Sequence, residues 1–260
     1  MGCLTDRVAI VTGGGRGIGR ATALRFAQEG ARILVATRSA EPGHETVDAI
    51  RAAGGTAVLE VCDMGDRASS RQIVKRAVEE FGKLDIVLHN AASGEGGYIA
   101  TAPDSRLEQI LNVGLKPCFW LTADALPYLE QSPAPRILIT SSISGNHYVT
   151  PGRAAYSAMK SGVTGFIRSA AIELAAKRIT VNGVEPGVTL TEQFCAHVPS
   201  DIVADMTGGI PLGRGVKPDE IADAFVYLAS DSAAMMTGQS LVIDGGASLG
   251  PDKPLTFDDH

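Results

Sequence analysis

The sequence predicts an α/β fold: a single doubly wound domain in which about seven parallel strands form a sheet with helices on both faces. Short runs rich in Val and Ile alternate with longer amphipathic runs, which is the order of strand–helix–strand units joined by right-handed crossovers. The short apolar runs also lack a strict period of two, as expected of strands that are covered on both faces.

The strands and helices alternate from one end of the chain to the other. The predicted strands are residues 7–12 (RVAIVT), 32–37 (RILVAT), 56–61 (TAVLEV), 84–89 (LDIVLH), 136–141 (RILITS), 178–184 (RITVNGV) and 240–243 (SLVI). The predicted helices, which have apolar residues at helical spacing, are residues 17–29, 41–53, 66–81, 104–129, 154–176 and 218–230. Pro117 lies inside the fourth helix, where it removes a backbone donor and should kink the helix.

No segment has the composition of an interdomain linker or a repeat, so residues 1–260 are expected to form one Rossmann-type domain. Residues 185–217 are weakly patterned, with room for a short helix or two. A long insertion of this kind in a compact α/β domain is typical of a substrate loop or lid. The turn-rich tail from Gly245 onward is expected to run over the surface or onto a neighbouring subunit.

The composition excludes some classes of partner. The chain has 23 basic and 29 acidic residues and a net charge of −6, which argues against general binding of nucleic acid or of an anionic membrane surface. No run reaches the ~18 uninterrupted apolar residues of a membrane span, and the N-terminus lacks the apolar segment of a signal peptide. The four cysteines are scattered, without metal-ligand spacing or a disulfide framework. We therefore expect a cytoplasmic protein with no metal site.

A glycine-rich turn follows the first strand and opens the first helix. Residues 12–19 read TGGGRGIG, and Gly13, Gly17 and Gly19 allow a tight turn whose backbone N–H groups can approach a pyrophosphate closely. The N-terminus of the helix adds a favourable dipole. This turn, in the first strand–turn–helix unit of a doubly wound chain, predicts a dinucleotide-binding site.

The segment AYSAMK, residues 155–160, gives a second chemical signal. If it is helical, Tyr156 and Lys160 are at i and i+4, on one face and about 5–6 Å apart at Cβ. An ammonium at that distance favours the ionised form of the phenol, so the tyrosine can serve as a proton donor. The alternative is that Tyr156 packs and Lys160 extends into solvent.

The glycine spacing G-x-x-x-G-x-G, together with Tyr156 and Lys160, resembles the short-chain dehydrogenase/reductase family. The resemblance covers nearly the whole chain. Further segments similar to family motifs are HNAA at 89–92, ITSSISG at 139–145, EPGVTLT at 185–191 and TGQSLVIDGG at 237–246. Two segments look most like the branch of 3-oxoacyl-acyl-carrier-protein reductases: IPLGRG at 210–215 and DEIADAFVYLASD at 219–231.

The resemblance implies a catalytic set of Asn112, Ser142, Tyr156 and Lys160. Tyr156 would give a proton to the oxygen of a ketone that receives a hydride, and Ser142 would hydrogen-bond that oxygen. Lys160 would also bind the nicotinamide ribose. Asn112 would help to hold a water that relays protons from Lys160.

The resemblance also assigns residues to cofactor and substrate. Asp63 would meet the adenine amino group or cap the next turn, and Asn90 could brace the core as much as touch the cofactor. His147 would face the substrate or lie on the surface. The cofactor set is Gly13, Arg16, Gly17, Ile18, Gly19, Thr37, Arg38, Asp63, Met64, Asn90, Ala91, Tyr156, Lys160, Pro186, Gly187, Val188 and Thr189. The substrate set is Ser142, His147, Tyr148 and Tyr156.

The end of the second strand favours NADP(H) over NAD(H). NAD-preferring relatives place an Asp there to bind the ribose 2′-hydroxyl, whereas this chain has Thr37 and Arg38, with Arg16 in the glycine turn. Two guanidiniums without a carboxylate suit a phosphate dianion. Elsewhere, His89 and Ala92 replace the commoner Asn and Gly of the family.

The leading hypothesis is an NADPH-dependent reductase that converts a ketone, with 3-oxoacyl thioesters as one candidate class, to a secondary alcohol. Two alternatives stay open. One is an alcohol or sugar-alcohol dehydrogenase that uses the same site oxidatively, and the other is a dinucleotide-binding redox sensor without turnover. The presence of all four catalytic residues counts against the sensor. The resemblance also implies a homotetramer, with interfaces from the helices around 104–129 and 154–176 and from residues 240–260.

Overall fold

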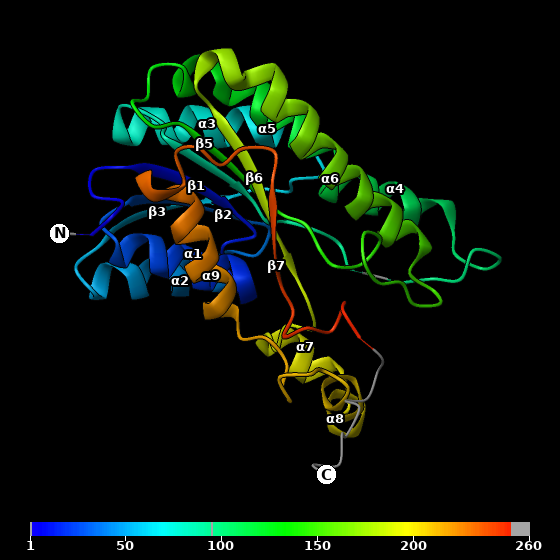
Figure 1. Ribbon diagram of the computed structural model, residues 1–260. Helices are drawn as coiled ribbons and strands as arrows, with labels where there is room; N and C mark the ends of the chain where they lie inside the picture. Colours follow the sequence, from blue (N-terminus) through cyan, green and yellow to red (C-terminus); the bar gives the residue numbers. More distant parts are fainter. Residues whose placement is uncertain (1, 95, 251–260) are drawn as a thin grey trace, which may run out of the picture.

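A computed structural model describes residues 2–94 and 96–250. Its centre is a seven-stranded parallel sheet in the order β3-β2-β1-β4-β5-β6-β7. The strands are β1 (Val8–Thr12), β2 (Arg32–Thr37), β3 (Thr56–Val61), β4 (Ile86–His89), β5 (Arg136–Thr140), β6 (Thr180–Pro186) and β7 (Ser240–Ile243). The predicted doubly wound parallel sheet is confirmed (Figure 1).

Helices cover both faces of this sheet. They are α1 (Gly17–Gln28), α2 (Ala40–Ala52), α3 (Arg67–Phe81), α4 (Asp104–Gly114), α5 (Lys116–Leu129), α6 (Ala154–Leu174), α7 (Glu192–His197), α8 (Ser200–Gly208) and α9 (Pro218–Ala229). Figure 1 shows α1, α2 and α9 on one face of the sheet and α3, α5 and α6 on the other.

Burial on both faces explains why the strands do not alternate apolar with polar residues. All five residues of β1 are buried. Val8 and Ile10 belong to the core beneath α3, α5 and α6, whereas Ala9 and Val11 belong to the core beneath α1, α2 and α9. Successive side chains of one strand therefore enter two different apolar layers.

The helix predicted over 104–129 is in fact two helices. α4 ends at Gly114 and α5 begins at Lys116, with Leu115 between them. Pro117 lies in the first turn of α5. An N–H group there has no partner within its own helix, so its absence costs α5 no hydrogen bond. Pro117 also cannot donate to a carbonyl of α4, so a single continuous helix cannot form here. The kink expected from Pro117 is therefore a complete break between helices.

The segment between β6 and β7 holds α7 and α8, in agreement with the short helices predicted in 185–217. Figure 1 shows both helices beyond the end of the sheet, away from the two helical layers. Neither helix buries a residue. At the base of this excursion, Val216 N donates to Val188 O and Leu190 N donates to Val216 O, both at 2.8 Å. Its role as a lid stays a prediction.

The described part of the tail, from Gly245 to Gly250, forms turns. The remaining tail residues, 251–260, for which a surface path or a subunit contact was predicted, lie outside the described residues. Within 2–94 and 96–250, none of the helices combines the length and the apolar character needed to cross a membrane. In the same residues, no group of three or more His, Cys, Asp and Glu side chains could hold a metal ion.

Candidate active site

The glycine turn has the geometry of an anion cradle. Gly13 and Gly17 have positive φ angles of 65° and 52°, which favour glycine. A Cβ on Gly19 would lie 2.2 Å from Gly13 O, so only glycine allows the first turn of α1 to pack against the end of β1. The N-cap residue Arg16 makes no side-chain capping bond. The first N–H groups of α1 are therefore available to a ligand, as a pyrophosphate requires.

Thr12 and Asn90 join the carboxyl ends of the central strands. Thr12 Oγ1 accepts hydrogen bonds from Asn90 N at 3.0 Å and Ala91 N at 3.1 Å, and Asn90 Nδ2 donates to Thr12 O at 3.2 Å. Thr140 Oγ1 donates to Asn90 Oδ1 at 3.0 Å. Asn90 thus braces the core, the alternative left open from the sequence, while it also lines the cavity described next.

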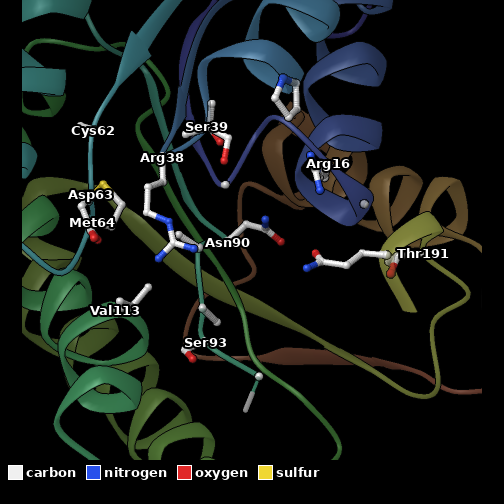
Figure 2. A pocket seen from close by; sticks show the side chains of 18 of the residues that line it. Arg16, Arg38, Ser39, Cys62, Asp63, Met64, Asn90, Ser93, Val113 and Thr191 are labelled. Carbon is white, nitrogen blue, oxygen red and sulfur yellow. The ribbon is translucent and has the colours of Figure 1, made fainter. Parts of the chain in front are cut away.

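A cavity of about 470 Å³ lies at the carboxyl ends of β1 to β4 (Figure 2). Predicted cofactor residues in its lining are Gly13, Arg16, Gly17, Thr37, Arg38, Asp63, Met64, Asn90 and Ala91. Lining residues that the sequence did not indicate are Ser39, Pro42, Cys62, Ala92, Ser93, Gly94, Gln109, Val113, Thr191 and Gln193. Predicted cofactor residues outside this lining are Ile18, Gly19, Tyr156, Lys160, Pro186, Gly187, Val188 and Thr189.

The end of β2 presents hydroxyl and guanidinium groups to this cavity. Figure 2 shows the Arg38 side chain extending into the cavity, with Asp63 and Met64 on one side and Asn90 on the other. Thr37 is close to the glycine turn, because a Cβ on Gly15 would lie 3.1 Å from Thr37 Oγ1. Asp63 lines the cavity, and its Oδ1 accepts a hydrogen bond from Gly65 N at 2.8 Å in the following turn. Its contact with the adenine amino group stays a prediction.

Tyr156 and Lys160 lie in the first two turns of α6, as the i, i+4 spacing predicted. Lys160 Nζ is 5.7 Å from the centroid of the Tyr156 ring. Lys160 is only 3% exposed, and its Nζ donates to Thr140 O at 2.7 Å. The lysine therefore does not extend into solvent; it is a buried cation beside the tyrosine.

Ser142 comes from the carboxyl end of β5 and is buried. Its Oγ accepts a hydrogen bond from Ser144 N at 3.1 Å, which holds the hydroxyl at the start of the loop that leads to α6. Thr140, two residues earlier, bonds both Asn90 and Lys160. The cavity lining and the catalytic candidates are thus linked through the end of β5.

Asn112, assigned from the sequence to hold a water beside Lys160, lies in α4. Asn112 lines a second cavity that also involves Arg38, Asp63 and Gly65. Residues 112 and 114 are about 200° apart around a helix, and it is Gly114 that packs against Met159, the residue before Lys160, because a Cβ on Gly114 would lie 2.6 Å from Met159 Sδ. The water-holding role of Asn112 stays a prediction.

His89, which replaces the commoner Asn of the family, lies between Thr12 of β1 and Gly114 at the end of α4. It is buried, its Nδ1 lies 3.1 Å from Thr12 Oγ1, and its Nε2 lies 3.3 Å from Gly114 O. Burial, followed by the nearby charge of Lys160, lowers the pKa of His89 to about 4. The imidazole is therefore neutral near pH 7 and ties β1 to the break between α4 and α5.

The loop after Ser142 contains a close contact between a histidine and a buried carboxylate that the sequence did not indicate. His147 Nε2 lies 3.0 Å from Glu185 Oε2, and Asn146 Nδ2 donates to Glu185 Oε1 at 3.1 Å. Glu185 is buried near the end of β6, whereas His147 and Tyr148 are exposed. Glu185 could not be identified from the sequence because its partners are some 40 residues away in the chain.

Comparisons with known proteins agree with this geometry. A family model described as enoyl-(acyl carrier protein) reductase matches residues 13–248. A 3-oxoacyl-acyl-carrier-protein reductase from Thermotoga maritima is 34% identical over 243 residues, which is 94% of this chain and 98% of the relative.

Solved structures with the same fold include two oxidoreductases. A short-chain dehydrogenase/reductase from Serratia marcescens superposes with a TM-score of 0.89 at 33% identity, over 94% of this chain and 99% of that one. A 7α-hydroxysteroid dehydrogenase in complex with NADH and 7-oxo glycochenodeoxycholic acid has a TM-score of 0.89 at 29% identity, over 94% of each chain. The chain therefore belongs to the short-chain dehydrogenase/reductase family of nicotinamide-dependent oxidoreductases.

Proposed function

We propose that this protein is an NADPH-dependent reductase that converts a ketone to a secondary alcohol. The observation that carries the proposal is the Tyr156–Lys160 pair on α6, with the ammonium buried and bonded to Thr140 O. A phenol held beside a buried cation can release its proton to a developing alkoxide. NADPH, when bound, supplies the hydride.

The reaction is balanced by one hydride and one proton. The carbonyl carbon of the ketone gains the hydride, and its oxygen gains the proton of Tyr156, while the cofactor is oxidised. Ser142 hydrogen-bonds the same oxygen as negative charge develops on it. Lys160 keeps its position through Thr140 O and favours the phenolate that remains on the tyrosine.

The residues of the cavity fit the adenosine half of a nicotinamide dinucleotide. The pyrophosphate would take the N–H groups at the start of α1, where the glycine cradle leaves room for it. Arg38 and Arg16 both reach this cavity, and Thr37 and Ser39 add hydroxyl groups beside them. No residue from Thr37 to Ser39 is acidic, so this end of β2 suits a 2′-phosphate better than free ribose hydroxyls.

The test is the loss of NADPH absorbance with a panel of ketones that includes a 3-oxoacyl thioester, and the formation of NADPH from NADP⁺ with alcohols and sugar alcohols. Reduction of at least one ketone supports the proposal. Efficient oxidation of alcohols without ketone reduction at neutral pH would favour the oxidative dehydrogenase. Tight cofactor binding without turnover of any compound would favour the redox sensor.

A further inference from the structure

Arg153 lies against the proposed proton donor. It is the N-cap residue of α6, three residues before Tyr156. Its guanidinium carbon is 4.2 Å from the centroid of the Tyr156 ring, closer than Lys160 Nζ at 5.7 Å. The guanidinium is thus within a few bond lengths of the atoms that would react.

The guanidinium is held in place by the segment that follows β4. Arg153 Nη1 donates to Gly94 O at 2.5 Å, and Gly94 lines the cofactor cavity. Beside it, Gly97 N donates to Gly152 O at 2.7 Å, and a Cβ on Gly96 would lie 2.9 Å from the same oxygen. The two loops therefore meet closely at Arg153, which spans the gap between the cavity edge and Tyr156.

Arg153 has no acidic partner within residues 2–94 and 96–250. Two buried carboxylates close to the substrate loop are already bonded. Glu185 faces His147 and Asn146, and Asp244 accepts hydrogen bonds from Gly246 N and Ser248 N, both at 2.8 Å. One nitrogen of Arg153 donates to a neutral carbonyl and the guanidinium lies against the Tyr156 ring, so among the described residues its charge has no ion-pair partner.

A positioned guanidinium that has no acidic partner among the described residues is a binding group for an oxyanion. Arginine presents its donors in a planar fork that matches a carboxylate, and such charge-assisted bonds are stronger than neutral ones. A neutral ketone or thioester would offer this cation no ion pair. A carboxylate in the same molecule as the ketone would satisfy it.

We infer that Arg153 binds a carboxylate of the substrate, so that the preferred substrates are oxo acids with one or two carbons between the ketone and the carboxylate. The short spacer follows from the contact between the guanidinium and the ring of the proton donor. This inference rests on the proposed ketone reductase function. It narrows the substrate class from ketones in general to small anionic ketones.

The test compares acetoacetate with methyl acetoacetate, which has the same ketone but no charge. In the wild type, kcat/KM with NADPH should be at least about tenfold higher for the acid. In Arg153→Gln the ratio of the two values should fall at least tenfold, and Arg153→Lys should give an intermediate ratio. The ratio is informative because a general disturbance of Tyr156 would lower both values together.

Arg106→Gln is the matched control. Arg106 Nη1 donates to Gly96 O at 2.6 Å, so it holds the same loop, but from α4 and not from the start of α6. Its acid-to-ester ratio should stay at the wild-type value. A ratio that falls equally in the Arg106 and Arg153 variants would show a loop effect and overturn the inference.

A binding measurement keeps the inference testable without turnover. Calorimetry should show acetoacetate binding to the NADP⁺ complex of the wild type and at least tenfold weaker binding to Arg153→Gln. Equal binding, or an acid-to-ester ratio near one in the wild type, would overturn the inference about Arg153. Absence of turnover with every ketone would instead contradict the proposed function, and the two failures are therefore distinguishable.

Discussion

Tyr156 and Lys160 lie together on α6, but the proposed chemistry gives them different roles: Tyr156 donates the proton, and Lys160 favours the phenolate. Tyr156→Phe deletes only the proton donor, so NADPH affinity should stay nearly unchanged while kcat falls by about 100-fold or more. Tyr227→Phe is a matched control, since Tyr227 is exposed on α9 on the other face of the sheet. The measurements are kcat with a reducible ketone and the Kd of NADPH by fluorescence. If Tyr156→Phe kept a turnover close to the wild-type value, Tyr156 would not be the proton donor.

Arg38 decides the cofactor preference in our proposal. A 2′-phosphate needs charge-assisted donors, each worth roughly 1.5–3 kcal/mol when well placed. Arg38→Gln should therefore weaken NADPH binding by about tenfold or more and leave NADH almost unchanged, because NADH lacks the phosphate. Thr37→Asp should reverse the preference by repelling the phosphate and accepting from the ribose hydroxyls.

The ratio of kcat/KM for NADPH over NADH tests this prediction. Arg71→Gln is the control, because Arg71 is exposed on α3 and does not line the cavity. The control should keep the wild-type ratio. A wild-type ratio below one would contradict the proposed NADPH preference, and Arg16 and Arg38 would then be ordinary solvated surface charges.

At the scale of elements, the break between α4 and α5 explains the burial of His89. Because Pro117 has no N–H and Cys118 N donates to Leu115 O, the carbonyl of Gly114 is left to His89 Nε2 and Cys118 Sγ. The end of β4 and the interrupted helix thus complete each other's hydrogen bonds.

His89 should make the stability of the fold depend on pH. Its pKa is lowered to about 4 in the folded protein, against about 6.5 in the unfolded chain. The unfolded chain therefore takes up the proton first, and stability should be lost as the pH falls from about 6.5 toward 4, by up to about 1.4 kcal/mol per pH unit. Above pH 6.5 this contribution is fully present.

The variant His89→Asn tests the assignment. Denaturant unfolding at a series of pH values should show a shallower loss of stability for the variant between pH 6.5 and 4.5 than for the wild type. His44→Asn is the control, since His44 is exposed on α2 and should leave the slope unchanged. Parallel curves for wild type and His89→Asn would refute the assignment.

Most of the elements could be predicted because their causes are local. The strands are runs rich in Val and Ile, of which β1, β4, β5 and β6 are buried throughout. Their predicted ends differ from the observed ones by at most two residues. The Tyr156–Lys160 pair was predictable for the same reason, since both residues belong to one helix. The water-holding role of Asn112 stays a prediction, because periodicity alone does not say which face of α4 meets Lys160.

Contacts between distant segments explain the remaining misses. Arg153 is an ordinary surface residue in sequence terms, and its place beside Tyr156 depends on Gly94 O, 59 residues away. Thr191 and Gln193 line the cofactor cavity only because the excursion that holds α7 returns toward the glycine turn. A Cβ on Gly17 would lie 3.0 Å from Thr191 Cγ2, which shows how closely they approach.

At the scale of the whole molecule, apolar side chains remain exposed on the layer of α4, α5 and α6. Leu107, Phe119 and Ile172 are 46%, 55% and 79% exposed. Phe119 also packs its ring edge against Phe166, with centroids 4.7 Å apart. Large exposed side chains on adjoining helices are typical of surfaces that bind another protein.

We propose that this layer, together with a second interface from residues 240–260 as the family resemblance implied, joins copies of the chain in a homotetramer. Burying one exposed phenylalanine in an interface is worth roughly 1.5–3 kcal/mol per copy, so Phe119→Asp should give a smaller species. Val61→Asp is the control, since Val61 is exposed on β3, at the edge of the sheet opposite β7, and should keep the wild-type mass because that position lies outside both proposed interfaces. Sedimentation velocity at micromolar concentration gives the mass of the wild type and of the two variants. A monomeric wild type would contradict the tetramer, and a Phe119→Asp protein of unchanged mass would move the interface away from α5.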